Sequence, residues 1–362
     1  MKLGLHAYSL VLAGGLRDSF KSVGRGPMTA SQLLEKAGLW KFNALQLAYN
    51  SRAEWDMVTL VNLGHAAKEL GISLHLSTHS LTGALPEKAI PKDGESQEEA
   101  NARVIAKHKM ANAGKGEHLA DMIRYAYTLG ASQVTVGLSN LQGNVSQRQG
   151  TLEKLLQELD VAIETAKRYN IMLAIENGRH TAAADLAAVI QAADSPFVGV
   201  CFDMGNPLTV PENPIDAARL LAPHCKSVHL KDYHVYRTVE GAMLVNCPLG
   251  EGAVEITEVV SALKLNTSDM PVFLQTSADR VAVPVLNDEF LQLYPRITAR
   301  ALAGLLRRGE HEYKDDEMRF PHEQKNVVER DVLKWEEDRL KRSLEKYFGP
   351  QSLTLPLGNA GA

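Results

Sequence analysis

The 362-residue sequence predicts an α/β protein that folds as a (β/α)₈ TIM barrel, with a long insert after strand three and a helical C-terminal extension. Short apolar runs alternate with amphipathic segments whose apolar residues recur every three to four positions. The runs are almost continuously apolar, which is typical of parallel strands buried on both faces. Ala13-Gly14-Gly15 follows the first run and lacks the G-x-G-x-x-G spacing of an open nucleotide-binding sheet. Repeated β-then-α units therefore favour a closed barrel.

Eight runs have the length and composition of barrel strands. In chain order they are Leu3–Ser9, Ala44–Ala48, Ser73–Ser77, Gln133–Gly137, Met172–Glu176, Val198–Asp203, Ser227–Lys231 and Val272–Gln275. The helical patterns between and after them are Ser31–Ala37, Met57–Leu70, Glu117–Leu129, Thr151–Tyr169, Thr181–Ala193, Ile215–Leu221, Glu255–Leu263 and Pro295–Leu306. Glycine or asparagine directly follows Leu70, Leu129 and Tyr169, and these residue types commonly end helices.

Two segments do not fit the repeat, so we expect a barrel over 1–308 and an extension over 309–362. Residues 80–116 follow strand three and contain two prolines and mixed charges. Loops of this length are usually functional lids or disordered, and the position of this one at the end of a barrel strand favours a lid. The extension has an apolar stripe along one possible helix, followed by an irregular arm at 350–362. The stripe fits packing on the outside of the barrel as well as a subunit contact.

Composition excludes several classes of protein. The chain is 45% hydrophobic and 23% charged with a formal net charge of −4, and its cations are scattered, so we expect neither nucleic acid nor a membrane as partner. Three cysteines argue against a disulfide framework and favour a cytoplasmic location. The N-terminus could be read as a signal peptide, but polar His6 and Tyr8 fit a first strand better.

Polar residues occupy the ends of four successive predicted strands. Strands five and six end in Glu176 and Asp203, strand seven contains His229, and strand eight ends in Gln275. The first three are separated by 27 and 26 residues, close to the roughly 30 residues of one barrel unit. All four side chains should therefore project from the face on which barrel enzymes carry their active sites.

These four groups form a plausible ligand set for a divalent metal. Carboxylate, imidazole and carboxamide donors suit Mn²⁺, Mg²⁺, Co²⁺ or Zn²⁺, and thiolates that would select a structural zinc are missing. Taken singly, an aspartate could cap a turn and a histidine could be an ordinary core residue. Two buried carboxylates at unit spacing would be costly without a cation, so the set as a whole favours a metal site.

The chain resembles the xylose-isomerase-like superfamily of sugar isomerases and epimerases over residues 1 to about 308. Four segments carry the resemblance: Ala174-Ile-Glu-Asn-Gly, Phe202-Asp-Met-Gly-Asn, Val228-His-Leu-Lys-Asp and Pro248-Leu-Gly-Glu-Gly. The resemblance implies a metal, Mn²⁺ first, held at Glu176, Asp203, His229 and a strand-eight glutamate. It also implies that the glutamates of strands five and eight exchange protons with the substrate from opposite faces. This chain has Gln275 instead, which can bind a metal through its oxygen but cannot act as a general base.

Other polar residues near the strand ends are candidates for the missing roles. His79, at the end of strand three, is the first choice for a second base, because histidine transfers protons near neutral pH. Lys231 could act on a substrate oxygen or pair with a carboxylate. The candidate substrate-binding residues are His6, His75, His180 and Arg237.

The leading hypothesis is a metal-dependent enzyme that moves a proton α to the carbonyl of a sugar or keto-sugar, as an isomerase or epimerase. Its rival is a lyase that eliminates the aglycone from a 3-keto-(C-)glycoside. Superfamily members that cleave keto-C-glycosides are similar to this chain and work with a small second subunit, so we expect such a partner or a homo-oligomer. An endonuclease with the same barrel is disfavoured by the acidic balance. A non-catalytic partner subunit is the last alternative.

Overall fold

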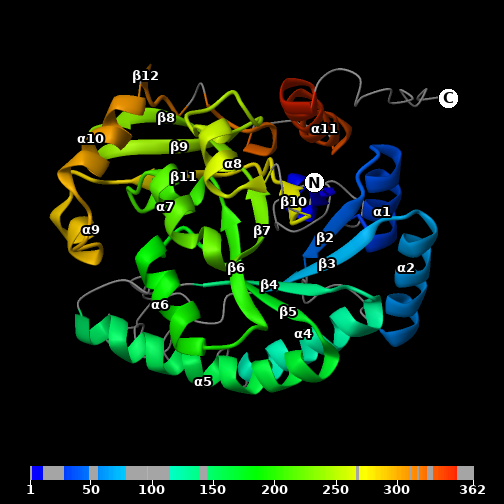
Figure 1. Ribbon diagram of the computed structural model, residues 1–362. Coiled ribbons are helices and arrows are strands. Elements are labelled where there is room, and N and C mark those ends of the chain that lie inside the picture. The colour runs from blue at the N-terminus through cyan, green and yellow to red at the C-terminus, as the bar shows by residue number, and fades with distance from the viewer. Residues whose placement is uncertain are drawn as a thin grey trace.

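The computed structural model confirms the (β/α)₈ barrel (Figure 1). It describes residues 2–10, 28–48, 56–78, 96, 115–138, 145–265, 269–309, 311–315, 318–323 and 329–348. Eight parallel strands close in the order β1-β10-β7-β6-β5-β4-β3-β2. Their bounds are β1 Lys2–His6, β2 Ala44–Ala48, β3 Ser73–Thr78, β4 Gln133–Gly137, β5 Met172–Glu176, β6 Val198–Asp203, β7 Cys225–Leu230 and β10 Pro271–Leu274. Each corresponds to one predicted strand.

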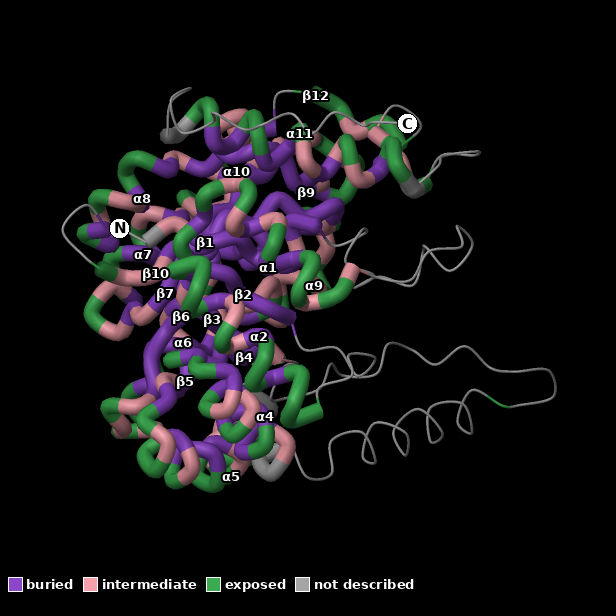
Figure 2. Tube along the Cα trace, turned by 90° about the vertical axis from the view of Figure 1, so that its right-hand side faces the viewer, coloured by how far each residue is buried: buried purple, intermediate pink, exposed green. Residues whose placement is uncertain are grey.

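Helices surround the strands, and all except α9 lie close to predicted positions. They are α1 Ala30–Leu39, α2 Met57–Glu69, α4 Lys115–Leu129, α5 Val145–Tyr169, α6 Ala183–Ala193, α7 Pro214–Leu221, α8 Ile256–Ala262, α9 Asp288–Leu293, α10 Ala299–Arg308 and α11 Glu329–Phe348. Figure 2 shows buried strands at the centre and helices whose outer faces are exposed. Among the described helices, none is long and apolar enough to cross a membrane.

The interior of the barrel is partly polar, because alternate residues of each strand face inwards. Phe273 of β10 crosses this interior and packs edge-on against His75 of β3, with ring centroids 4.9 Å apart. Gly4 of β1 makes room for it, since a Cβ atom there would lie 2.4 Å from the Phe273 ring. Phe273 and His75 therefore fill part of the barrel interior between β10 and β3.

A second, four-stranded sheet lies beside the barrel and was not predicted. Its order is β11-β9-β8-β12, with β8 at Asp232–Thr238, β9 at Gly241–Cys247, β11 at Arg280–Val283 and β12 at His311–Glu312. The β8–β9 hairpin follows β7 directly, so the predicted strand over Ser227–Lys231 continues into a new element instead of a loop.

Asp232, at the junction of β7 and β8, shapes the Pro248-to-Gly252 segment. Its Oδ2 accepts hydrogen bonds from the backbone N–H groups of Gly250 and Gly252 at 3.0 and 2.9 Å. Its Oδ1 accepts from those of Tyr233 and Val254. Burial raises the pKa of this carboxyl to about 6 in spite of these four donors. The backbone N–H groups of the Pro248-to-Gly252 segment thus bind the carboxylate of Asp232.

The C-terminal helix α11 packs against the same chain. Glu337 pairs with Lys36 of α1, and the Ser343 hydroxyl accepts a hydrogen bond of 3.0 Å from the Leu249 backbone N–H. The Arg339 guanidinium is buried, stacks over the Trp335 ring at 4.6 Å and donates to Asn246 of β9. The helix therefore joins the start of the barrel to the second sheet, and a subunit contact stays a prediction.

Two predicted features fall outside the described residues. The insert over 80–116 is described only at Ser96 and at the start of α4, and the arm at 350–362 is not described.

Candidate metal centre

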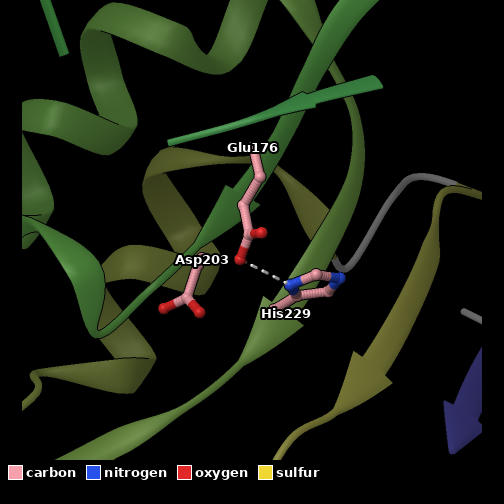
Figure 3. A group of neighbouring side chains, drawn as sticks. All are labelled: Glu176, Asp203 and His229. Carbon is pink, nitrogen blue, oxygen red and sulfur yellow. Dashed lines mark hydrogen bonds and ion pairs between the residues drawn. The ribbon is translucent and has the colours of Figure 1, made fainter. Parts of the chain in front are cut away.

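Glu176, Asp203 and His229 converge at the C-terminal ends of β5, β6 and β7 (Figure 3). One ligand atom from each lies within 4.8 Å of the others. The Nδ1 atom of His229 is 3.2 Å from Glu176 Oε1. Among the described residues, this is the only group of three or more such side chains that could hold a metal ion. The structure thus brings together the three residues that the strand spacing singled out.

The turn after β6 fixes the carboxylate of Asp203. Its Oδ1 accepts hydrogen bonds from the backbone N–H groups of Gly205 and Asn206 at 2.9 and 3.0 Å. The Asn177 side chain accepts from the Asp203 backbone N–H at 2.6 Å and donates to its carbonyl oxygen at 3.0 Å. Asp203 Oδ2 is left buried without a hydrogen bond among the described residues. The backbone therefore holds one oxygen, and the other lies 3.4 Å from the ammonium group of Lys231.

The charges in this cluster depend on one another. Burial raises the pKa of Asp203, although the Lys231 charge opposes the shift. Burial also acts to raise the pKa of Glu176, but the hydrogen bond and charge of His229 outweigh it and the pKa is lowered. For His229, burial acts to lower the pKa, and the contacts to Cys201 and Glu176 raise it well above its ordinary value. Without a cation, each of these two groups therefore favours the charged form of the other.

Gln275 lies next to the triad, directly after β10. It is buried, and among the described residues its Oε1 has no hydrogen-bond partner. It lines a cavity of about 220 Å³ together with Glu176 and His229. Gln275 Oε1 has no hydrogen-bond partner among the described residues, and Asp203 Oδ2 has only the Lys231 ammonium group 3.4 Å away. Both oxygens could bind a cation, because buried acceptors normally have a donor or a cation. The residues present therefore fit a divalent cation.

The cavity has further polar walls, which the sequence analysis did not identify apart from His6. Its other lining residues are His6, Tyr8, Ser77, Thr78, Thr135 and Gly137. The His6 ring stacks on Tyr8 at 5.1 Å and meets His229 edge-on at 4.7 Å. Burial, with the charges of His229 and Lys231, lowers the pKa of His6 well below its ordinary value. His6 is therefore a neutral hydrogen-bonding group in the wall.

The other candidate residues lie elsewhere. His75 is buried against Phe273 and is not among the described residues that line the cavity. His180 is exposed in the turn after β5. Arg237 belongs to the second sheet, where its Nε donates to the Gly309 carbonyl oxygen at 2.6 Å, so it does not line the cavity. His79 lies outside the described residues.

Lys231 is buried and lies between carboxylates. Its Nζ is 3.4 Å from Asp203 Oδ2 and 3.9 Å from Asp279 Oδ2. Asp279 is also buried and pairs with Arg179. This placement matches the carboxylate-pairing interpretation of Lys231, and Asp279 is a buried acid that sequence reasoning missed because it follows the last barrel strand within an irregular segment.

A larger hollow of about 570 Å³ lies between α6, α7 and α10. Its wall includes Glu212 and Asp185 but none of the triad, and among the described residues it holds no grouped metal ligands. The smaller cavity is therefore the better candidate for chemistry.

Comparison with known proteins agrees with this fold. The chain is 28% identical over 125 residues to a 3-oxo-isoapionate decarboxylase of Pectobacterium atrosepticum, a match that covers 34% of this chain and 46% of that protein. The chain spans less than two thirds of the curated relatives that it matches.

Two solved structures have the same fold at low sequence identity. A D-tagatose 3-epimerase-like protein superposes with a TM-score of 0.53 at 19% identity, covering 76% of this chain and 91% of that one. The IOLI protein, whose structure has a binding zinc atom, gives 0.51 at 13% identity, covering 85% of this chain and 96% of that one. A model of the family described as xylose isomerase-like TIM barrel matches residues 32–290. This match covers well over half of the chain, which therefore belongs to the xylose isomerase-like TIM barrel family.

Proposed function

We propose that this protein is a divalent-metal-dependent enzyme of carbohydrate metabolism that removes a proton next to the carbonyl of a sugar or keto-sugar, with Glu176 as the base. The observation that carries the proposal is the cluster of Glu176, Asp203 and His229, of which Glu176 and His229 line a cavity with polar walls. The epimerase-like and decarboxylase relatives support an enzyme that acts on sugars or sugar acids.

Glu176, Asp203, His229 and Gln275 would hold the cation. When bound, it would supply Lewis acidity towards a carbonyl or hydroxyl oxygen of the substrate. Mn²⁺ is the first choice for this donor set and Zn²⁺ is an alternative, which the zinc atom of the IOLI structure supports.

The cytoplasmic location of the protein stays a prediction from the cysteine count.

Glu176 is the only carboxylate among the described residues that line the cavity. A single base can take a proton and return it to the neighbouring carbon on the same face, which is isomerisation. Two-base epimerisation needs a second group on the opposite face, and Gln275 cannot supply it. Neutral His6 can hydrogen-bond a substrate oxygen, and His79 remains the candidate for a second base.

A lyase is the second candidate, and Gln275 favours it. Elimination from a 3-keto-(C-)glycoside begins with the same proton removal and then expels the aglycone, so no base is needed on the opposite face. The decarboxylase relative is itself a lyase by name. If the protein is a lyase, we propose that it works with a small second subunit. If it is an isomerase, we propose that it forms a homo-oligomer.

The two candidates are separated by incubating the Mn²⁺-loaded protein in D₂O with free ketoses and with 3-keto-glycosides. Ketose–aldose conversion with deuterium uptake supports the isomerase, and aglycone release supports the lyase. Glu176→Gln should abolish either activity, because a carboxamide cannot accept the proton. If neither substrate class exchanges deuterium with Mn²⁺, Co²⁺ or Zn²⁺ bound, the proposal is wrong. Purification from the native host, followed by intact-mass measurement of the complex, tests the partner.

A further inference from the structure

We propose that Gln46, on the opposite wall of the barrel, is a positioning residue that sets the tautomer of His229. Gln46 lies in β2, is fully buried, and its Oε1 is 2.8 Å from His229 Nε2. The Nδ1 atom of the same ring faces Glu176 at 3.2 Å. The two ring nitrogens therefore have different tasks, and Gln46 contacts the one that points away from the acids.

The carboxamide oxygen only accepts hydrogen bonds, so Nε2 must carry the proton. In the neutral ring, Nδ1 then has a free lone pair directed at the cluster with Glu176 and Asp203, as a metal ligand requires. The reversed amide would present its NH₂ group to Nε2 and move the ring proton to Nδ1, where it would block the ligand position. The orientation of one amide thus decides whether His229 can bind a cation.

The surroundings of Gln46 favour this role over a structural one. Among the described residues, its buried Nε2 has no hydrogen-bond partner, so the amide does not stabilise the barrel by bonding at both ends. An unsatisfied buried donor is unfavourable. An apolar side chain of equal length would avoid that cost. The contribution that distinguishes Gln46 from such a side chain is the oxygen that accepts a hydrogen bond from His229.

Cys201 provides a matched control. Its Sγ is 3.3 Å from the same His229 Nε2 and is equally buried, but sulfur is a weak acceptor. Without the Cys201 thiol, Gln46 should still hold the ring proton on Nε2. Without the Gln46 carboxamide, the thiol should be too weak an acceptor to hold the proton there.

The inference rests on the proposed metal site but not on the reaction. Mn²⁺ alone is titrated into wild type, Gln46→Met, Gln46→Glu and Cys201→Ala by competition with a fluorescent chelator. We expect Gln46→Met to bind Mn²⁺ about 10- to 100-fold more weakly. Cys201→Ala should stay within about threefold of wild type, and Gln46→Glu, which restores an acceptor, should recover most of the affinity. Circular dichroism in EDTA checks that each variant is folded.

The tautomer is read directly by long-range ¹⁵N–¹H NMR of the metal-free protein, at a pH above the pKa of His229 so that the ring is neutral, with His229 assigned from His229→Asn. Wild type should show the proton on Nε2, and Gln46→Met a mixture. A wild-type proton on Nδ1, or unchanged Mn²⁺ affinity in Gln46→Met, overturns the role of Gln46. If Gln46→Met does not fold, two other results test the proposal. The wild-type ring must carry its proton on Nε2, and Gln46→Glu must keep most of the Mn²⁺ affinity. Wild type that binds no divalent metal refutes the metal site itself.

Discussion

Glu212 should destabilise the protein above neutral pH, and replacing it by glutamine should remove that effect. Its two carboxylate oxygens accept from the Ala183 backbone N–H at the start of α6, at 3.2 and 3.0 Å. Burial, with a smaller contribution from the Asp185 charge, raises its pKa from 4.5 to about 7. A carboxyl with a raised pKa keeps its proton in the native state after the unfolded state has released it. Stability therefore falls as the pH rises from 4.5 to 7.

The size of the effect follows from the pKa. A rise from 4.5 to about 7 corresponds to about 3 kcal/mol of unfolding free energy. Glu212 is partly exposed, so solvent screening reduces this to about 1–3 kcal/mol at pH 8. Glutamine keeps one acceptor oxygen for Ala183 and carries no charge. Glu212→Gln should therefore gain about 1–3 kcal/mol at pH 8 and much less at pH 5.

Thermal unfolding at pH 5 and pH 8 measures this difference. For a chain of this length, the expected rise in Tm at pH 8 is about 1–4 °C. Glu258→Gln is the control, because Glu258 is an exposed residue in the first turn of α8 and should show no gain that grows with pH. If Glu212→Gln changes Tm equally at both pH values, or lowers it at pH 8, the carboxyl is not held in its neutral form by burial.

Two further substitutions test the extension and the fourth ligand. Arg339→Met should lower the free energy of unfolding by about 2–4 kcal/mol, because Asn246 and Ser277 lose a buried charged donor; an unchanged urea midpoint would contradict this. Gln275→Glu should bind Mn²⁺ at least about tenfold more tightly and lower Tm in EDTA, because it adds a third carboxylate beside Glu176 and Asp203. Unchanged Mn²⁺ affinity, measured by chelator competition, would show that residue 275 is not a ligand.

The barrel and the triad could be predicted because both follow from a repeat. Parallel strands buried on two faces give continuous apolar runs, and unit spacing places Glu176, Asp203 and His229 at one end of the barrel. The register shows why this works, since Asp203 pairs with His229 and Glu176 pairs with Cys201 across neighbouring strands.

Features outside the repeat were not predictable in this way. Strand β8 mixes aromatic and polar residues and lacks a continuous apolar run. Strand β9 is mostly buried and has an apolar run, but it stands outside the β-then-α repeat. Arg237 was predicted to bind substrate, whereas it lies in β8 and donates to the Gly309 carbonyl oxygen. Gln46 was overlooked because its role depends on a contact across the barrel, 183 positions away in the chain.

The charges around the cluster give a physical reason for glutamine at the end of the eighth strand. Lys231 lies 3.4 Å from Asp203 and offsets part of its negative charge, while Asp279 is shared by Lys231 and Arg179. With a divalent cation at the site and His229 neutral, Glu176, Asp203 and these three neighbours leave one net positive charge. A glutamate at 275 would cancel it. We infer that the chain keeps this excess because removing a proton next to a carbonyl creates negative charge on the substrate, which a positive site stabilises. For the proposed reaction, Gln275 would thus give up a second base and strengthen the proton removal that the isomerase and the lyase share.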